Sequence, residues 1–166
     1  MKKLLMIGLS LIMIFNMAAC SNTENNKGNE EKPKKELAEI ISENRDKQAN
    51  DAVGIVDSND DEGAQITFEM LGIDEKDMDK YAISLSPMNI SAYCVAIVKP
   101  AEGKKDLIKE AFEKYKKSQE DAFEQYLQDQ YKIAKDAIIT EAGDYIIFAM
   151  CEDSQSLRDN LANALK

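Results

Sequence analysis

Cys20 is the residue of this chain with the clearest chemical context. Three residues, Met17, Ala18 and Ala19, stand directly before it, so two small side chains precede a thiol. This spacing resembles the bacterial lipobox, in which diacylglycerol is joined to the thiol before the chain is cleaved. Met17 stands where that motif usually has leucine. The pattern predicts lipid attachment at Cys20, with palmitate-type acyl chains as the membrane anchor.

The residues before Cys20 have the order of a secretory signal peptide. Lys2 and Lys3 form a charged start, and an apolar run follows over residues 4–17. As a helix that run would be roughly 21 Å long, which is shorter than the roughly 30 Å hydrocarbon core of a bilayer. We therefore expect a signal peptide at 1–19 and localisation at the cell membrane, lipid-anchored on the extracytoplasmic face.

Two further cysteines, Cys94 and Cys151, lie in the body of the chain. An even pair in an oxidising compartment permits one disulfide, provided that the two Cα atoms come within about 7 Å. Two free buried thiols are the favoured interpretation, and a Cys94–Cys151 disulfide is the alternative. The chain contains no histidine, so neither thiol has the commonest activating base.

The acidic loop at residues 57–63 has clustered oxygen ligands of the kind that calcium prefers. Counting from Asp57, the sixth position of the EF-hand pattern is Glu62 and the twelfth is Phe68, where the pattern requires glycine and glutamate. A solvated acidic turn is the preferred interpretation. No metal, cofactor or catalytic residue is predicted, because the phosphate-binding, dinucleotide-binding and serine-nucleophile motifs are also absent.

Aromatic residues on a long helical segment could line a ligand pocket. Tyr115, Phe123 and Tyr126 recur at helical spacing, and Gln119 stands among them where an apolar residue is expected. Aromatic residues at this spacing usually belong to the core, and that is the favoured interpretation here. The alternative is a pocket with Gln119 on its wall.

The acidic composition limits the partners. The formal net charge is −10, and removal of Lys2 and Lys3 with the signal peptide makes it −12. A nucleic-acid partner is not expected, because phosphate binding needs a cluster of lysine and arginine side chains. The membrane is expected as a partner only through the lipid on Cys20.

The remaining pattern predicts an α+β domain. We expect a lipid-anchored disordered tether at 20–35 and a single domain at 36–166. The predicted fold is a four-stranded antiparallel sheet made of two hairpins, with helices packed mainly on one face. Within it we expect a first helix that begins at Leu37 and ends between 44 and 50, helices at 62–71 and 74–77, and strands at 81–86 and 91–98. After Gly103 we expect a long helix to about Gln130, then strands at 137–140 and 145–150, and a last helix at 155–165 with Ser154 as its N-cap.

These elements resemble an uncharacterised family of small Gram-positive lipoproteins, domain of unknown function 4358. The resemblance covers about residues 37–161. The residues that carry it are Met88 and Asn89 at a turn, Lys99 at a strand end, Gln119, Phe123 and Tyr126 on the long helix, and Gly143, Asp144 and Tyr145 before the last strand. The family has no assigned activity, so the resemblance implies a fold and a location but no reaction.

The sequence therefore leaves three hypotheses for function. The leading one is a non-catalytic lipoprotein that binds an envelope protein or a small ligand, or that helps an envelope assembly. The second is a small solute-binding lipoprotein associated with a transporter. The third is an envelope enzyme that uses carboxylates, which would need two of them within about 5 to 10 Å in a pocket.

Overall fold

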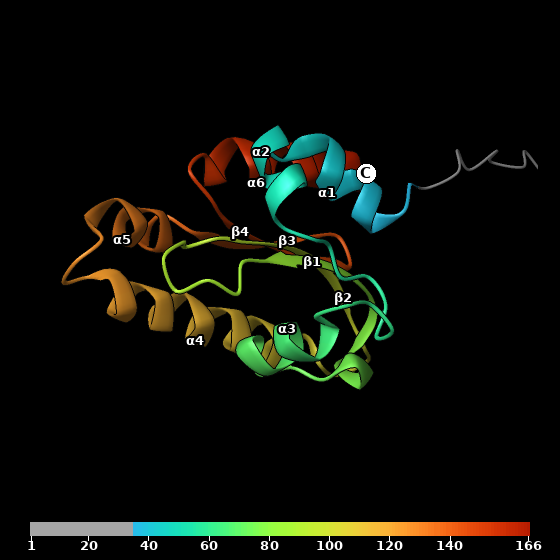
Figure 1. The fold of residues 1–166 in the computed structure, drawn as a ribbon. Helices are drawn as coiled ribbons and strands as arrows, with labels where there is room; N and C mark the ends of the chain where they lie inside the picture. Colours follow the sequence, from blue (N-terminus) through green and yellow to red (C-terminus); the bar gives the residue numbers. More distant parts are fainter. Residues whose placement is uncertain (1–34) are drawn as a thin grey trace, which may run out of the picture. The chain divides into compact units, whose positions relative to one another are not determined.

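Four antiparallel strands form the centre of the fold. The computed structural model describes residues 35–166, which belong to one compact unit. The strands are β1 (Met78–Leu85), β2 (Cys94–Pro100), β3 (Ile138–Ala142) and β4 (Tyr145–Met150), in the order β1-β2-β4-β3 (Figure 1). Two hairpins thus lie side by side and are joined where β2 pairs with β4. The predicted α+β class with a four-stranded antiparallel sheet is confirmed.

Helices cover both faces of this sheet. In the view of Figure 1, α1 (Leu37–Asn44), α2 (Lys47–Ala52) and α6 (Ser154–Ala164) lie above it, and α3 (Ala64–Leu71) and α4 (Lys105–Phe123) lie below it. The prediction that helices pack mainly on one face is wrong. Its physical reason is that the central strands are apolar on both sides: residues 94–98 of β2 and 146–150 of β4 are all fully buried.

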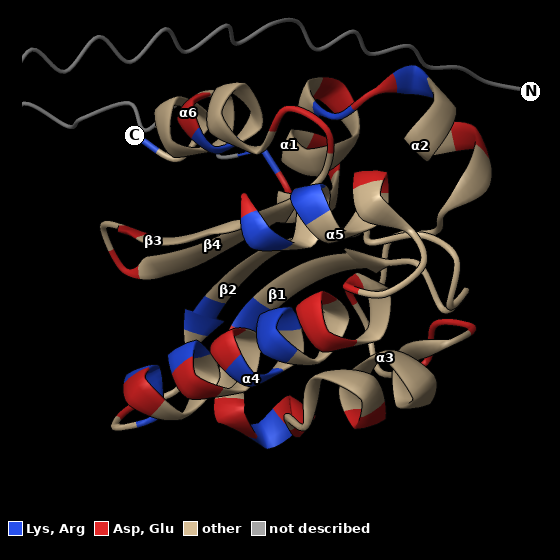
Figure 2. Ribbon diagram, turned by 90° about the vertical axis from the view of Figure 1, so that its left-hand side faces the viewer, with Lys and Arg blue, Asp and Glu red and all other residues tan. Residues whose placement is uncertain are grey.

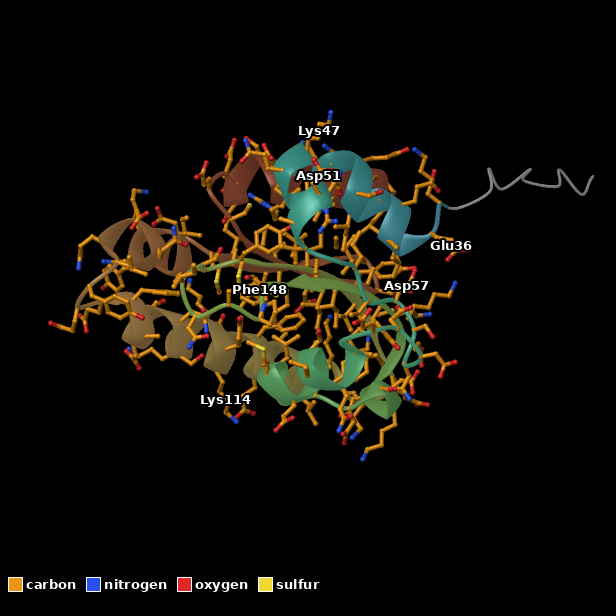
Figure 3. All side chains as sticks on the ribbon, in the orientation of Figure 1. Glu36, Lys47, Asp51, Asp57, Lys114 and Phe148 are labelled. Atoms are coloured by element: carbon orange, nitrogen blue, oxygen red, sulfur yellow. The ribbon has the colours of Figure 1, made fainter. Side chains whose placement is uncertain are left out.

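The sheet therefore separates two hydrophobic cores. The core under α1 and α6 is built on Val95, Ile97, Ile147 and Ala149. The core over α3 and α4 is larger, and Phe148 lies at its middle, stacked on Phe112 with 5.1 Å between the ring centroids. Figure 3 shows Phe148 between the sheet and α4, whereas Lys114 on the outer side of α4 points away from the molecule.

The outward side of α4 carries alternating acidic and basic residues (Figure 2). Two ion pairs one turn apart, Lys114 with Glu110 and Lys117 with Asp121, lie on that side. Such pairs add only tenths of a kilocalorie per mole to helix stability. The charged side of α4 is therefore a solvated surface, and its opposite side provides the packing.

The predicted long helix is divided in two. α4 ends at Phe123, and α5 (Gln128–Lys135) follows after a turn in which the Leu127 amide donates to the Phe123 carbonyl. One helix from Lys105 to Lys135 would be roughly 46 Å long, while the eight-residue β1 spans roughly 26 Å. The break returns the chain to the sheet, so that Ala134 is buried in the larger core and β3 can pair.

Smaller differences occur at element ends. β4 begins and ends at its predicted bounds, the other three strands differ from theirs by one to three residues at each end, and α2 was not predicted. Asp153, not Ser154, caps α6, because its carboxylate accepts a hydrogen bond from the Ser156 amide at 3.2 Å. Ser154 is instead the first, buried residue of the helix, and its hydroxyl donates to the Cys151 carbonyl.

Several predictions fall outside the described residues. The signal peptide at 1–19, Cys20 and all of the tether except residue 35 belong to this group. Within residues 35–166, no helix is both long and apolar enough to cross a membrane.

Candidate functional site

The four residues of the predicted aromatic pocket lie in different environments. Tyr115 and Phe123 are buried members of the larger core, and the Tyr115 ring meets Phe148 edge-on at 6.3 Å. Gln119 is half-buried on α4, and Tyr126 is 62% exposed in the turn after it. Two core residues and an exposed one do not make the walls of one cavity, so these positions support the core interpretation for Tyr115 and Phe123.

Both body cysteines are free. Cys94 is fully buried in the core beside α4, while Cys151 is half-buried and packs against the core on the opposite face of the sheet. The register explains this separation: Cys94 pairs with Met150, so Cys151 is the next residue along and its side chain projects to the other face. The structure thus has no Cys94–Cys151 disulfide.

The acidic loop folds on itself. The Asp61 carboxylate accepts hydrogen bonds from the Asp57 and Ser58 amides at 2.8 and 2.9 Å. These two bonds lower the pKa of Asp61 below its usual value. Within residues 35–166, no group of three or more histidine, cysteine, aspartate or glutamate side chains is placed to hold a metal ion.

A different set of polar residues gathers at one end of the sheet, on the face covered by α1 and α6. Ser84 lies near the end of β1, Tyr93 directly precedes β2, and Cys151 directly follows β4. Because β2 pairs with both neighbours, the register places these three positions close together across the strand ends. Ser84 is completely buried, and its hydroxyl donates to the Gly54 carbonyl at 2.9 Å.

Arg45 reaches this cluster from the end of α1. The helix stops at Asn44, and Arg45 has extended backbone angles that turn it out of the helix. Its Nε donates to Asn50 Oδ1, and its Nη1 donates to Ser84 Oγ, both at 2.5 Å. A longer contact of 3.5 Å joins Nη1 to the Tyr93 hydroxyl. All three partners are uncharged, and Arg45 makes no ion pair within the described part of the chain.

Burial sets the protonation of the neighbouring groups. It raises the pKa of the Tyr93 hydroxyl, and the hydrogen bond and charge of Arg45 offset this only in part. It also raises the pKa of the Cys151 thiol, against weaker opposing contacts from Asp153 and Ser154. Both groups are therefore neutral at pH 7, and Cys151 lacks the lowered pKa of a nucleophilic cysteine.

Arg45, Tyr93 and Cys151 border an open hollow of about 670 Å³. It lies between the α1–α2 turn, the start of α6, the loop before β2 and α5, and three carboxylates line it together with Arg45: Asp46, Glu152 and Asp153. We call it the Arg45 hollow. Its size and its mixture of polar and apolar walls suit a small ligand.

A second, smaller hollow of about 310 Å³ has a more apolar character. Ile66 and Met88, which are 56% and 55% exposed, lie on its border together with Val53 and Leu85. Large apolar side chains exposed at neighbouring positions are typical of contact surfaces between proteins.

Sequence reasoning missed Arg45 as a site residue. One signal was present: the chain has two arginines among many lysines, and Arg45 directly follows the amphipathic segment at 37–44. The partners Ser84 and Tyr93 are about 40 and 50 residues further on, and only the strand register brings them together.

One family model, described as Domain of unknown function (DUF4358), matches residues 56–151, which is more than half of the chain. The chain belongs to this family. The DUF4358 match contains all four strands with α3, α4 and α5, and it includes Ser84, Tyr93 and Cys151. It does not contain Arg45, α1, α2 or α6, so it is shorter than the expected resemblance over 37–161. No curated protein and no solved structure matches the chain.

Proposed function

We propose that this protein is a lipoprotein, anchored on the extracytoplasmic face of the cell membrane through Cys20, whose folded domain is a non-catalytic binding module. The signal-peptide pattern and the lipobox-like residues before Cys20 support the anchor. The DUF4358 family adds no reaction. The Arg45 hollow is the ligand site of this proposal.

One observation carries the binding role: a half-buried guanidinium is held in place by uncharged partners and keeps free donors. Arg45 Nη2 has no hydrogen-bond partner among residues 35–166, while Nε and Nη1 are fixed by Asn50 and Ser84. A structural arginine is normally paired with a carboxylate, because removing its charge from water is costly. An oriented and unpaired guanidinium is instead suited to bind an incoming anionic group.

The anchor is tested by fatty-acid labelling of cells that express the wild-type precursor or its Cys20→Ala variant. We expect the label and the membrane association to be lost in the variant. A Cys20→Ala protein that is still acylated and membrane-bound would refute the lipoprotein assignment.

The binding role is tested by native mass spectrometry of protein extracted gently from membranes. Asn160→Trp places a bulky side chain on the exposed border of the Arg45 hollow, and Glu113→Trp adds the same bulk on the exposed side of α4. We expect a bound species with the wild type and Glu113→Trp but not with Asn160→Trp. Equal binding by both variants would remove the hollow as the ligand site.

A second candidate function is favoured by the apolar hollow at Ile66 and Met88. There the domain would dock a protein of an envelope assembly through exposed apolar side chains. Crosslinking from Ile66→Cys in membranes tests it, because a defined crosslinked protein that disappears with Met88→Glu supports docking. Crosslinking that is unaffected by Met88→Glu contradicts it.

A further inference from the structure

The Arg45 hollow is lined by more negative than positive side chains. Arg45 is the one basic residue among the described residues that line it, against the three carboxylates of Asp46, Glu152 and Asp153, so the formal charge of the lining is −2. Asp46 and Asp153 each accept a hydrogen bond from a helix-start amide, at 2.6 and 3.2 Å. Glu152 is exposed and makes no hydrogen bond or ion pair with another described residue.

This charge distribution selects against ligands of a single sign. A phosphate or dicarboxylate would meet Arg45 but would also be repelled by the acidic border. A simple cation would be attracted to the carboxylates but would be repelled by the Arg45 guanidinium. A ligand with one carboxylate and one ammonium group satisfies both parts of the hollow.

The lining of the hollow also includes aliphatic side chains. The volume of about 670 Å³ leaves room for a short hydrocarbon chain against them. The apolar residues are Ala49, Ala52, Val53, Ile133 and Leu157. The hollow therefore combines a carboxylate-binding donor, aliphatic side chains and three carboxylates.

Resting on the proposed binding role, we infer that the ligand of the Arg45 hollow is a small zwitterion with an aliphatic body, such as an amino acid or a short peptide. Its carboxylate accepts hydrogen bonds from Arg45 Nη2, and its ammonium group faces Glu152 and Asp153. Tyr93 and Ser84 act as positioning residues, since they hold the guanidinium and do not contact the ammonium group.

The chain offers an internal control for the test. It contains two arginines, so the Nε–H region of an NMR spectrum should hold two signals. Arg158 pairs with Asp159 on α6 and is not among the residues that line the hollow. The unacylated mature chain with Cys20→Ser is titrated with 4-aminobutyrate, butyrate and butylamine. We expect 4-aminobutyrate to shift the Arg45 signal and not the Arg158 signal. Butyrate and butylamine should bind at least tenfold more weakly.

A charge variant makes the assignment of the ammonium group specific. Glu152→Gln should weaken the binding of 4-aminobutyrate by about two- to fivefold, as expected for the loss of one exposed ion pair. The same variant should strengthen the binding of butyrate, because a repelling charge is gone. Arg45→Lys should weaken 4-aminobutyrate as well, because lysine keeps the charge but loses the fixed fork of donors.

The outcomes separate this inference from the proposed function. Butyrate or butylamine binding as tightly as 4-aminobutyrate would overturn the zwitterion assignment and leave the hollow as a ligand site. A second result would also overturn the zwitterion assignment but keep the hollow as a ligand site. In it, none of the three probes shifts the Arg45 NMR signal, while native mass spectrometry shows a bound species that Asn160→Trp removes. If native mass spectrometry shows no bound species with the wild type either, the proposed function itself is refuted.

Discussion

The two body cysteines differ in how deeply their side chains are buried. Cys94 is completely buried, and burial strongly raises the pKa of its thiol. Cys151 is half-buried at the Arg45 hollow, and its pKa is also raised. Because the thiolate is the reactive form, both should react slowly, and the more exposed thiol should react first.

We predict that a maleimide labels Cys151 slowly and Cys94 not at all in the folded protein with Cys20→Ser. Both should react at once in denaturant. Mass spectrometry after proteolysis identifies the labelled site, and Cys151→Ser serves as the control that leaves no labelling in the folded state. Faster labelling of Cys94 than of Cys151 would contradict the placement of the two thiols.

Asp77 gives the clearest pH dependence. Its buried carboxylate is 2.8 Å from Lys104 Nζ and also accepts a hydrogen bond from the Asp74 amide. Lys104 is the main cause of a pKa below the usual 3.8, and the Asp74 amide adds to it. A lowered folded pKa means that this stabilisation is complete above about pH 4 and is lost as the pH falls through the folded value.

We therefore predict that Asp77→Asn lowers the free energy of unfolding at pH 7 and that this difference from the wild type shrinks as the pH falls below 4. Urea unfolding between pH 7 and pH 2.5 measures it. The matched control is Asp60→Asn, an exposed residue of the acidic loop. A difference that stays constant over this range would contradict the ion pair with Lys104.

Among the elements of the fold, the turns place the strictest limits on backbone conformation. The second hairpin closes between Ala142 and Tyr145, and Gly143 in this turn has a φ of 60°. Residues other than glycine are strained in this left-handed region. Gly54, before the Val56 bridge to β1, lacks a positive φ and has free space where a Cβ would be.

We predict that Gly143→Ala lowers the free energy of unfolding by about 1 kcal/mol, while Gly54→Ala changes it by less than about 0.5 kcal/mol. Chemical denaturation of the two variants beside the wild type checks this. Equal effects at the two positions would show that the left-handed turn is not what constrains Gly143.

Local signals explain which elements the sequence could predict. The hairpins have turn residues between apolar runs, and the predicted helices that begin at 37 and at 62 show regular apolar spacing and, for the second, Gly72 at its end. The break between α4 and α5 has no such signal, because residues 124–127 contain neither glycine nor proline. That break follows from the length of the strands that the helix packs on, which is a property of the assembled fold.

The candidate site was less predictable than the fold for the same reason. Tyr115, Gln119, Phe123 and Tyr126 share a helical spacing, which indicates a core face and not a cavity. The Arg45 hollow depends on contacts across about 40 residues or more, between a helix end and two strand ends. Periodicity along the chain contains no information on such contacts.

For the whole molecule, the important feature is that one sheet supports two cores. The family match at 56–151 includes the sheet and the larger core, but α1 and α6, which bury the second core, lie outside it. Without these helices, Val95, Ile97 and Ile147 would be exposed to water. The second core should therefore be as necessary for folding as the first.

We predict that Leu161→Ala, in the second core, lowers the free energy of unfolding by about 2 to 5 kcal/mol. Phe148→Ala, in the larger core, should lower it by about 3 to 5 kcal/mol. The control is Leu107→Ala on α4. Because Leu107 is 38% exposed, its replacement should lower the free energy of unfolding by less. A cooperative transition is expected for each, and a Leu161→Ala effect as small as that of Leu107→Ala would make α6 dispensable.

The melting temperature of the protein, measured in membranes and after purification, shows whether the Arg45 hollow holds a ligand. A ligand that binds the folded state raises the melting temperature by mass action, whatever its identity. We predict a higher value in membranes for the wild type and for Glu113→Trp, and no such difference for Asn160→Trp, whose side chain blocks the Arg45 hollow. The same increase in all three proteins would contradict a ligand site at Arg45.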